Sequence, residues 1–123
     1  MDSRSERNLQ GVKSELARIV RRGYGISSIP FQVIEGVRTL VREKELLKQG
    51  ATTTLRSRHL TGHAIDVMAL VNGKGVWDVP AYRRIAEAMK QAAKELGIPL
   101  EWGGDWKSFK DWGHFQLPWK EFP

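Results

Sequence analysis

Three side chains of this 123-residue chain have the types and spacing of a metal site. His59 and Asp66 form an H-x6-D pattern, and His114 lies much further along the chain. Zinc binds imidazole and carboxylate ligands readily, and a catalytic zinc site uses three protein ligands while a fourth position is left for water. Asp111, shortly before His114, would then be free to exchange protons with that water. These residues predict a catalytic zinc site with a neighbouring acid.

Small residues surround the first two predicted ligands. Ser57, Gly62 and Ala64 complete the pattern S-x-H-x-x-G-x-A-x-D. Small side chains allow a histidine on a loop to approach an aspartate on a strand closely. Asp66 also lies within an apolar run, where an unpartnered carboxylate would be costly to bury. A bound metal would remove that cost, so these surroundings favour a metal site over a chance spacing.

Two residues of this region have competing interpretations. His63 is close enough to His59 in sequence to be a fourth ligand, but Gly62 and the strand expected after it argue against a helical H-x3-H pair. We therefore expect His63 to be an exposed or hydrogen-bonded neighbour of the site. Asp111 could instead cap a turn in its loop. Its position beside His114 favours the catalytic role.

The composition excludes several classes of site. The chain has no cysteine, so disulfides, thiolate-bound zinc and a cysteine nucleophile are excluded. Lys and Arg number 20 against 14 Asp and Glu, and the formal charge of +6 favours polyanions such as nucleic acid, anionic lipid or an acidic wall polymer. The basic residues are scattered along the sequence, however, as on an ordinary solvated surface.

Hydrophobic periodicity predicts two helices and one strand in the first part of the chain. Apolar residues recur at three- and four-residue intervals in the segment 5–22, which predicts an amphipathic helix ended by Gly23. Residues 31–35 form a short β-prone run. The leucine-bearing segment 40–49 predicts a second helix, with Gly50 in the left-handed conformation at its end.

The remaining elements complete an α+β pattern. Residues 79–96 predict the clearest helix, with Asp78 as its N-cap and Gly97 after its last turn. Around it we expect an exposed basic loop at 52–58, a strand at 64–71, a turn at 72–75 and short strands at 98–102 and 114–117. The fold class is therefore α+β: a single compact domain with a small antiparallel sheet, about three flanking helices and the zinc site at the sheet.

The combination of these motifs resembles the zinc D-alanyl-D-alanine and LAS-type peptidase family, especially its short phage endolysins that cut L-alanyl-D-glutamate bonds. The resemblance rests on S-x-H-x-x-G-x-A-x-D together with D-x-x-H at 111–114. It extends over most of the chain, including segments 30–33, 35–39, 60–64 and 101–106. It implies that residues 1–123 form one zinc peptidase domain.

The resemblance also implies roles for individual residues. His59, Asp66 and His114 would bind one zinc ion, and Asp111 would act as general base and acid. Arg38 matches a family arginine near the metal that holds the scissile carbonyl oxygen as it gains charge, a role that suits the planar fork of a guanidinium. The competing interpretation of Arg38 is a surface ion pair with Glu35 or Glu43.

Three further features bear on the site. Gly113 departs from the proline or tryptophan of relatives, which predicts a looser loop around Asp111. Glu43 stands where relatives often carry glutamine, so a neutral hydrogen-bonding role there is not expected. Four of the five tryptophans lie between 102 and 119, and we expect most of them to pack in the core, with one or two forming a wall for substrate.

The implied function is a zinc-dependent peptidoglycan stem-peptide hydrolase, an L-alanyl-D-glutamate endopeptidase that acts as a phage or prophage endolysin in host lysis. Cleavage of D-alanyl-D-alanine is the alternative within the family. A non-catalytic wall-binding or nucleic-acid-binding basic domain is the alternative from another class. We expect the peptidoglycan stem peptide as partner, no nucleic acid, and a monomer.

The expected location follows from the absence of targeting segments. The start of the chain, 1–7, is charged and no apolar run of signal-peptide length follows it. No segment reaches the roughly 20 apolar residues that span a bilayer. We therefore expect synthesis in the host cytoplasm and action in the periplasm or cell wall after a separate membrane protein opens the way.

Overall fold

A computed structural model describes residues 1–50 and 57–123. It confirms the α+β class and the single compact domain, with four α-helices in its described part in place of about three. In chain order the elements are α1 (Ser3–Asn8), α2 (Ser14–Ile26), β1 (Phe31–Glu35), α3 (Leu40–Lys48), the 3-10 helix η1 (Arg58–Thr61), β2 (Ala64–Val71), β3 (Lys74–Val76), α4 (Val79–Leu96), β4 (Glu101–Trp102), the 3-10 helix η2 (Gly103–Asp105) and β5 (His114–Gln116).

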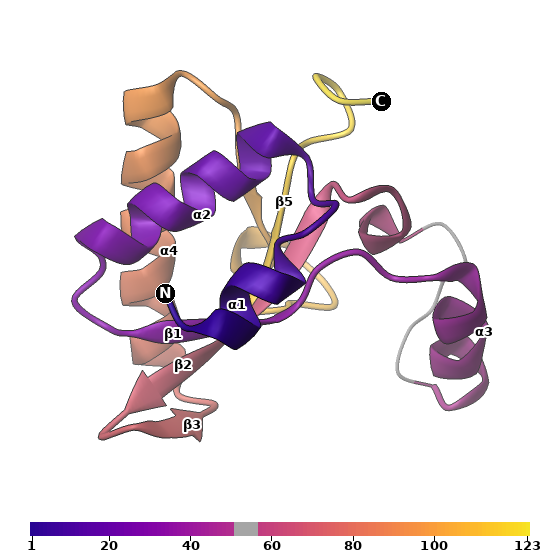
Figure 1. The fold of residues 1–123 in the computed structure, drawn as a ribbon, viewed down its shortest axis with the longest axis horizontal. Helices are drawn as coiled ribbons and strands as arrows, with labels where there is room; N and C mark the ends of the chain where they lie inside the picture. Colours follow the sequence, from indigo (N-terminus) through magenta and orange to yellow (C-terminus); the bar gives the residue numbers. More distant parts are fainter. Residues whose placement is uncertain (51–56) are drawn as a thin grey trace.

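The sheet is antiparallel and is built around β2. The strand order is β1-β2-β5-β4, and β3 pairs with the far end of β2. β2 is the longest strand, with eight residues, so it can pair with β1, β3 and β5 along different parts of its length. β5, which lies near the C-terminal end of the chain, pairs with β2 (Figure 1). Segments far apart in sequence therefore meet at β2.

The two faces of the sheet have different chemistry because side chains alternate along each strand. One face is apolar and carries Val33, Ile65, Val67, Phe115 and Trp102, all of which belong to the main core. The opposite face carries polar side chains that are paired across the strands: Glu35, Asp66, His114, Gln116 and Glu101. The candidate ligands Asp66 and His114 therefore share the face that does not form the core.

Two helices, α2 and α4, form the layer of the core next to the apolar face. α2 contributes buried Leu16, Ile19 and Val20 at helical spacing, and α4 contributes residues such as Tyr82 and Met89. The two helices cross each other in Figure 1, while α3 stands on the other side of the molecule. Within residues 1–50 and 57–123, no helix has both the length and the apolar character needed to cross a membrane.

The expected single helix over 5–22 is wrong. The chain leaves helical geometry around Gly11, which has φ +80°, a conformation that side chains with a Cβ rarely adopt. α2 then continues through Gly23 to Ile26. A Cβ on Gly23 would lie 2.5 Å from the sulfur of Met89, so this glycine allows α2 and α4 to pack closely and does not end the helix.

Two other expectations need correction. The turn predicted at 72–75 is confined to Asn72 and Gly73, both at positive φ, and Lys74 already begins β3. The strand predicted at 98–102 is only two residues long. Residues 52–56 of the predicted exposed loop lie outside the described residues, and Arg58, which was expected in that loop, is buried in η1.

Candidate metal centre

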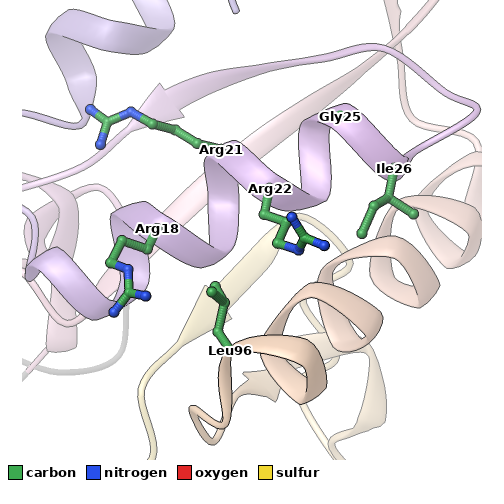
Figure 2. Close-up of a pocket in the computed structure, with 6 residues that line it drawn as sticks. All are labelled: Arg18, Arg21, Arg22, Gly25, Ile26 and Leu96. Carbon is green, nitrogen blue, oxygen red and sulfur yellow. The ribbon is translucent and has the colours of Figure 1, made fainter.

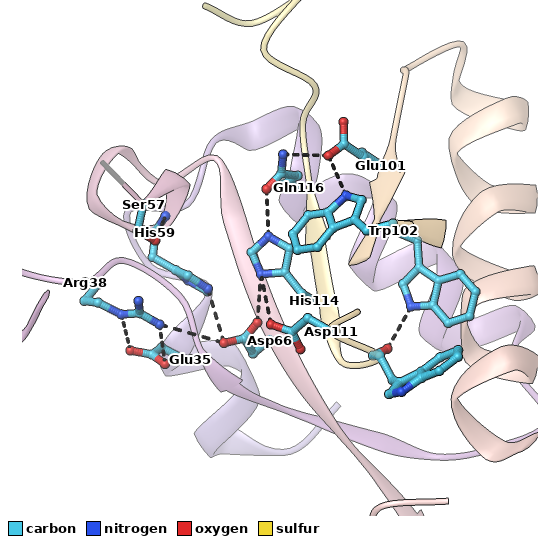
Figure 3. Close-up of polar contacts among 12 residues, drawn as sticks. Glu35, Arg38, Ser57, His59, Asp66, Glu101, Trp102, Asp111, His114 and Gln116 are labelled. Atoms are coloured by element: carbon cyan, nitrogen blue, oxygen red, sulfur yellow. Dashed lines mark hydrogen bonds and ion pairs between the residues drawn. The ribbon is translucent and has the colours of Figure 1, made fainter. Parts of the chain in front are cut away.

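The three predicted ligands come from three different elements and meet at one point. His59 lies in η1, Asp66 near the start of β2 and His114 at the start of β5. One ligand atom from each lies within 4.8 Å of the others. The sheet register places His114 directly opposite Asp66, and Figure 3 shows both imidazoles turned toward the Asp66 carboxylate. The structure therefore brings together the residues that the sequence indicated.

The carboxylate of Asp66 lies between the two rings. Its Oδ2 is 3.2 Å from Nε2 of His59, and its Oδ1 is 3.1 Å from Nδ1 of His114. The outer ring nitrogens face oxygen acceptors: Nδ1 of His59 lies 2.9 Å from the carbonyl of Gly36, and Nε2 of His114 lies 2.7 Å from Oε1 of Gln116. A neutral ring that donates to its outer acceptor has a lone pair on its inner nitrogen, as metal-bound histidines do.

The donor set and the charge of the region fit a divalent cation. Two imidazole nitrogens and one carboxylate are the ligands of a three-residue zinc site, and the site has no sulfur donor. Negative side chains outnumber positive ones nearby, since Glu35, Glu43 and Asp66 surround the single guanidinium of Arg38. A cation between the inner nitrogens and Asp66 would reduce this excess.

The electrostatics of the cluster favour an ionised aspartate. Burial raises the pKa of Asp66, but the hydrogen bonds from His114 and His59 outweigh burial and hold its pKa far below the usual range. Burial likewise lowers the pKa of His114, whereas its hydrogen bonds with Asp66 and Gln116 raise it, and the net pKa lies above the ordinary value. The pocket therefore stabilises positive charge beside Asp66.

Asp111 lies at the edge of the cluster, where the sequence placed it. Its Oδ2 is 4.0 Å from Nδ1 of His114, and 53% of its side chain is exposed. Its backbone N–H donates to the carbonyl of Gly103 at 3.1 Å, which fixes the loop. Desolvation and the negative charge of Asp66 raise the pKa of Asp111. The carboxyl group thus has access both to solvent and to the space in front of the predicted ligands.

Gly113, for which a looser loop than in relatives was expected, lies directly against β2. The carbonyl of Gly113 accepts a hydrogen bond of 2.9 Å from the backbone N–H of Val67. A Cβ on Gly113 would lie only 2.6 Å from the carbonyl oxygen of Val67. The glycine therefore allows the loop with Asp111 to lie directly against β2, because a larger residue would force the two backbones apart.

Arg38 lies beside the cluster and is buried, contrary to the alternative of a surface ion pair. Its Nε and Nη2 donate to the two carboxylate oxygens of Glu35 at 2.7 and 2.9 Å, and Nη1 donates to Glu43 at 3.0 Å. Both expected partners are therefore present, but only 8% of the Arg38 side chain and none of the Glu43 side chain is exposed. Nη2 also lies 3.9 Å from Oδ2 of Asp66.

A family model described as phage L-alanyl-D-glutamate peptidase matches residues 1–115. The chain belongs to this family. Family membership confirms the resemblance inferred from the sequence motifs, and the matched residues include all five predicted site residues.

Individual relatives agree with the family match. A crystal structure of the L-Ala D-Glu endopeptidase ChiX of Serratia marcescens has 47% sequence identity and a TM-score of 0.95, covering 100% of this chain and 92% of that one. The L-alanyl-D-glutamate peptidase of Escherichia phage T5 is 37% identical over an alignment of 112 residues that covers 88% of this chain and 82% of the relative.

A more distant structure shares the fold alone. The vancomycin resistance D,D-dipeptidase VanXYg has 19% identity and a TM-score of 0.52, covering 86% of this chain and 50% of that one. The general architecture of this peptidase family therefore extends to a protein that is named for a different peptide bond.

His63 is buried and lies outside the metal cluster of this family member. It is 8% exposed, and its Nδ1 lies 2.6 Å from the hydroxyl oxygen of Thr61. Of its two expected states, exposed or hydrogen-bonded, the second is correct. Burial lowers its pKa, and the positive charges of Arg58 and Lys13 lower it further.

Several polar residues around the ligands were missed by sequence reasoning. Gln116 forms hydrogen bonds with His114 and Glu101. Its position two residues after His114 places it on the same strand face, and this spacing could have indicated a contact with His114. Glu101 contacts Gln116 across the β4–β5 ladder, and that register is not visible in the sequence. The carbonyl of Gly36 is a backbone group, for which residue type gives no signal.

The tryptophans divide between the core and the vicinity of the site. Trp102 is buried in the core, as expected for most of them. Trp106 lies beside the metal cluster, with its ring centroid 5.2 Å from that of His114. Trp119 is half exposed and stacks on the guanidinium of Arg58, with 4.1 Å between the guanidinium carbon and the ring centroid. Of these three tryptophans, Trp106 is therefore the one that lies beside a predicted ligand.

A separate hollow lies between α2 and the end of α4 (Figure 2). Arg21 and Arg22 at this hollow are paired with Glu6 and Glu95. The pairing balances much of the positive charge, and the lining contains none of the predicted site residues. Its lining residues are Arg18, Arg21, Arg22, Gly25, Ile26 and Leu96.

Proposed function

We propose that this chain is a zinc-dependent peptidoglycan hydrolase that cleaves the stem peptide between L-alanine and D-glutamate. The observation that carries the proposal is the convergence of His59, Asp66 and His114, whose inner donor atoms face one another in a member of this peptidase family. The similarity to ChiX, an L-Ala D-Glu endopeptidase, and to the L-alanyl-D-glutamate peptidase of phage T5 supports the bond specificity.

The proposed zinc ligands are Nε2 of His59, a carboxylate oxygen of Asp66 and Nδ1 of His114. When bound, zinc supplies a Lewis acid that polarises a carbonyl and lowers the pKa of coordinated water to about 7. The protein contributes the orientation of the ligands, since the Gly36 carbonyl and Gln116 hold the outer ring nitrogens.

Asp111 is the proposed general base and acid. Its carboxylate accepts a proton from the attacking water and then donates that proton to the departing amine of D-glutamate. Asp111 is therefore ionised again at the end of each turnover. Its partial exposure admits water and substrate, and its raised pKa brings the group closer to the working pH than an ordinary aspartate.

Arg38 is proposed to stabilise negative charge that develops on the scissile carbonyl. A guanidinium has five N–H donors, and three hydrogen bonds to Glu35 and Glu43 hold this one in place. The second hydrogens of Nη1 and Nη2 remain, and Nη2 lies on the side of Asp66. A fixed cation next to the reacting group requires little reorganisation during the reaction.

We further infer that the protein is a phage or prophage endolysin that acts as a monomer in host lysis. It would be made in the host cytoplasm and act in the periplasm or cell wall. The phage family and the phage T5 relative support this assignment. A net charge of +6 suits an anionic wall polymer.

Reconstitution tests the proposed metal chemistry. Protein stripped with a chelator should release no soluble peptides from purified peptidoglycan, and added zinc should restore release. Wall binding without turnover in the presence of zinc would instead support a non-catalytic wall-binding domain.

A further inference from the structure

The imidazole of His114 lies between two oxygen acceptors on opposite sides of the ring. Oδ1 of Asp66 is 3.1 Å from Nδ1, and Oε1 of Gln116 is 2.7 Å from Nε2. A neutral imidazole has one N–H, so it can donate to only one of them. If the hydrogen is on Nδ1, the metal-facing nitrogen has no lone pair. The tautomer of this ring therefore decides whether His114 can be a ligand.

The side chain of Gln116 alone does not fix that tautomer, because an amide can present either its oxygen or its NH2 group. Its Nε2 lies 2.9 Å from Oε2 of Glu101, however, and an ionised carboxylate only accepts hydrogen bonds. The NH2 group must therefore face Glu101, which turns the amide oxygen toward His114. The indole N–H of Trp106 donates to the same carboxylate oxygen at 2.9 Å and helps to hold it.

The sheet register brings together these four side chains, which we call the relay: Asp66, His114, Gln116 and Glu101. Asp66 is opposite His114 in the β2–β5 pair, and Gln116 is opposite Glu101 in the β5–β4 pair. His114 and Gln116 are two residues apart and share one strand face. Gln116 is 5% exposed, so water competes little for its amide. Figure 3 shows the side chains in a continuous row from Asp66 to Glu101.

We propose that Glu101 and Gln116 are positioning residues that place the hydrogen of His114 on Nε2 and leave Nδ1 free to bind the metal. This inference rests on the proposed metal role of His114. His59 has no equivalent dependence on side chains, since its outer nitrogen faces the backbone carbonyl of Gly36. Substitutions in the relay should therefore affect one ligand of the three.

Two variants test the proposal. Glu101→Gln keeps the shape but allows the Gln116 amide to turn, and Gln116→Met removes the acceptor. We expect each to weaken zinc binding by about 10- to 100-fold in a chelator competition, the usual effect of groups that orient metal ligands. Glu87→Gln, an exposed substitution on α4 that makes the same change of charge as Glu101→Gln, should change zinc affinity less than about twofold.

Nitrogen-15 NMR of metal-free protein at about pH 9, well above the usual imidazole pKa, provides the second measurement. The natural chain should show an N–H on Nε2 of His114, and both variants should shift the hydrogen toward Nδ1. Unchanged zinc affinity, or weaker affinity with an unchanged tautomer, would overturn the proposal. If the natural chain did not bind zinc, the proposed function would fail, while the NMR comparison would still decide whether Glu101 and Gln116 set the tautomer.

Discussion

Asp66 and His114 lie opposite each other in the β2–β5 ladder, and their side chains approach to 3.1 Å. The proximity of these two candidate ligands is thus a consequence of sheet register. A slip of one residue would turn Asp66 toward the apolar core and replace it with Ile65 or Val67 on the site face. The precision of the candidate site depends on the same strand pairing that builds the core.

Replacing Asp66 with Asn should abolish tight zinc binding. The substitution keeps the side-chain size but removes the charge between the two imidazoles, and we expect a loss greater than the roughly 100-fold upper effect of outer-shell changes. Chelator competition and metal analysis would measure it, with circular dichroism to show that the fold is kept. Retention of one tightly bound zinc ion would show that Asp66 is not a ligand.

Replacing Asp111 with Asn should separate metal binding from catalysis. The variant should bind zinc normally, because Asp111 is outside the three-residue cluster. Turnover of peptidoglycan should fall by about 10²- to 10⁴-fold, the usual contribution of a general acid or base. Asp105→Asn, an exposed acid that pairs with Lys90 on the surface, is the matched control and should keep its activity. Equal activity of the two variants would remove Asp111 from the mechanism.

Arg38 combines a structural and a proposed catalytic role, and paired substitutions can separate them. Arg38→Met leaves the fully buried Glu43 without its cation, which should lower the free energy of unfolding by about 3–5 kcal/mol in urea titrations. The double variant Arg38→Met, Glu43→Leu should recover part of that stability. Turnover should stay low in both, whereas recovery of turnover together with stability would assign Arg38 a structural role alone.

Gly113 should tolerate no side chain. In Gly113→Ala the new Cβ would press on the Val67 carbonyl, and overpacking of this kind costs about 1–3 kcal/mol of unfolding free energy. Gly25→Ala is the matched control, because nothing lies within 4 Å of a Cβ there and alanine favours helix by up to about 1 kcal/mol. Equal thermal midpoints for the two variants would show that the loop against β2 can move.

Sequence reasoning succeeded where the chemistry of a residue determines its place. The cluster of His59, Asp66 and His114 could be predicted because few side chains are able to bind metals, and small residues surround these three in the sequence. α4 could be predicted because its apolar period is uninterrupted, with Pro80 in its first turn and Gly97 in the left-handed conformation after its last.

The features that could not be predicted from the sequence depend on contacts between segments that are distant in sequence. The apolar period of the first segment runs across Gly11, so it gave no sign that α1 and α2 are separate helices. The backbone N–H of Lys13, just after that break, donates to the carbonyl of Gly62 at 2.9 Å, a contact that only the folded chain reveals. The Gln116–Glu101 relay likewise depends on strand register, which periodicity alone does not supply.

Product analysis tests the central claim most directly. Purified peptidoglycan digested by the zinc-loaded protein should yield, by mass spectrometry, new L-alanine carboxyl ends and new D-glutamate amino ends. The Asp111→Asn variant should yield neither. Release of D-alanine, or new ends at any other stem-peptide bond, would contradict the proposed L-alanyl-D-glutamate specificity.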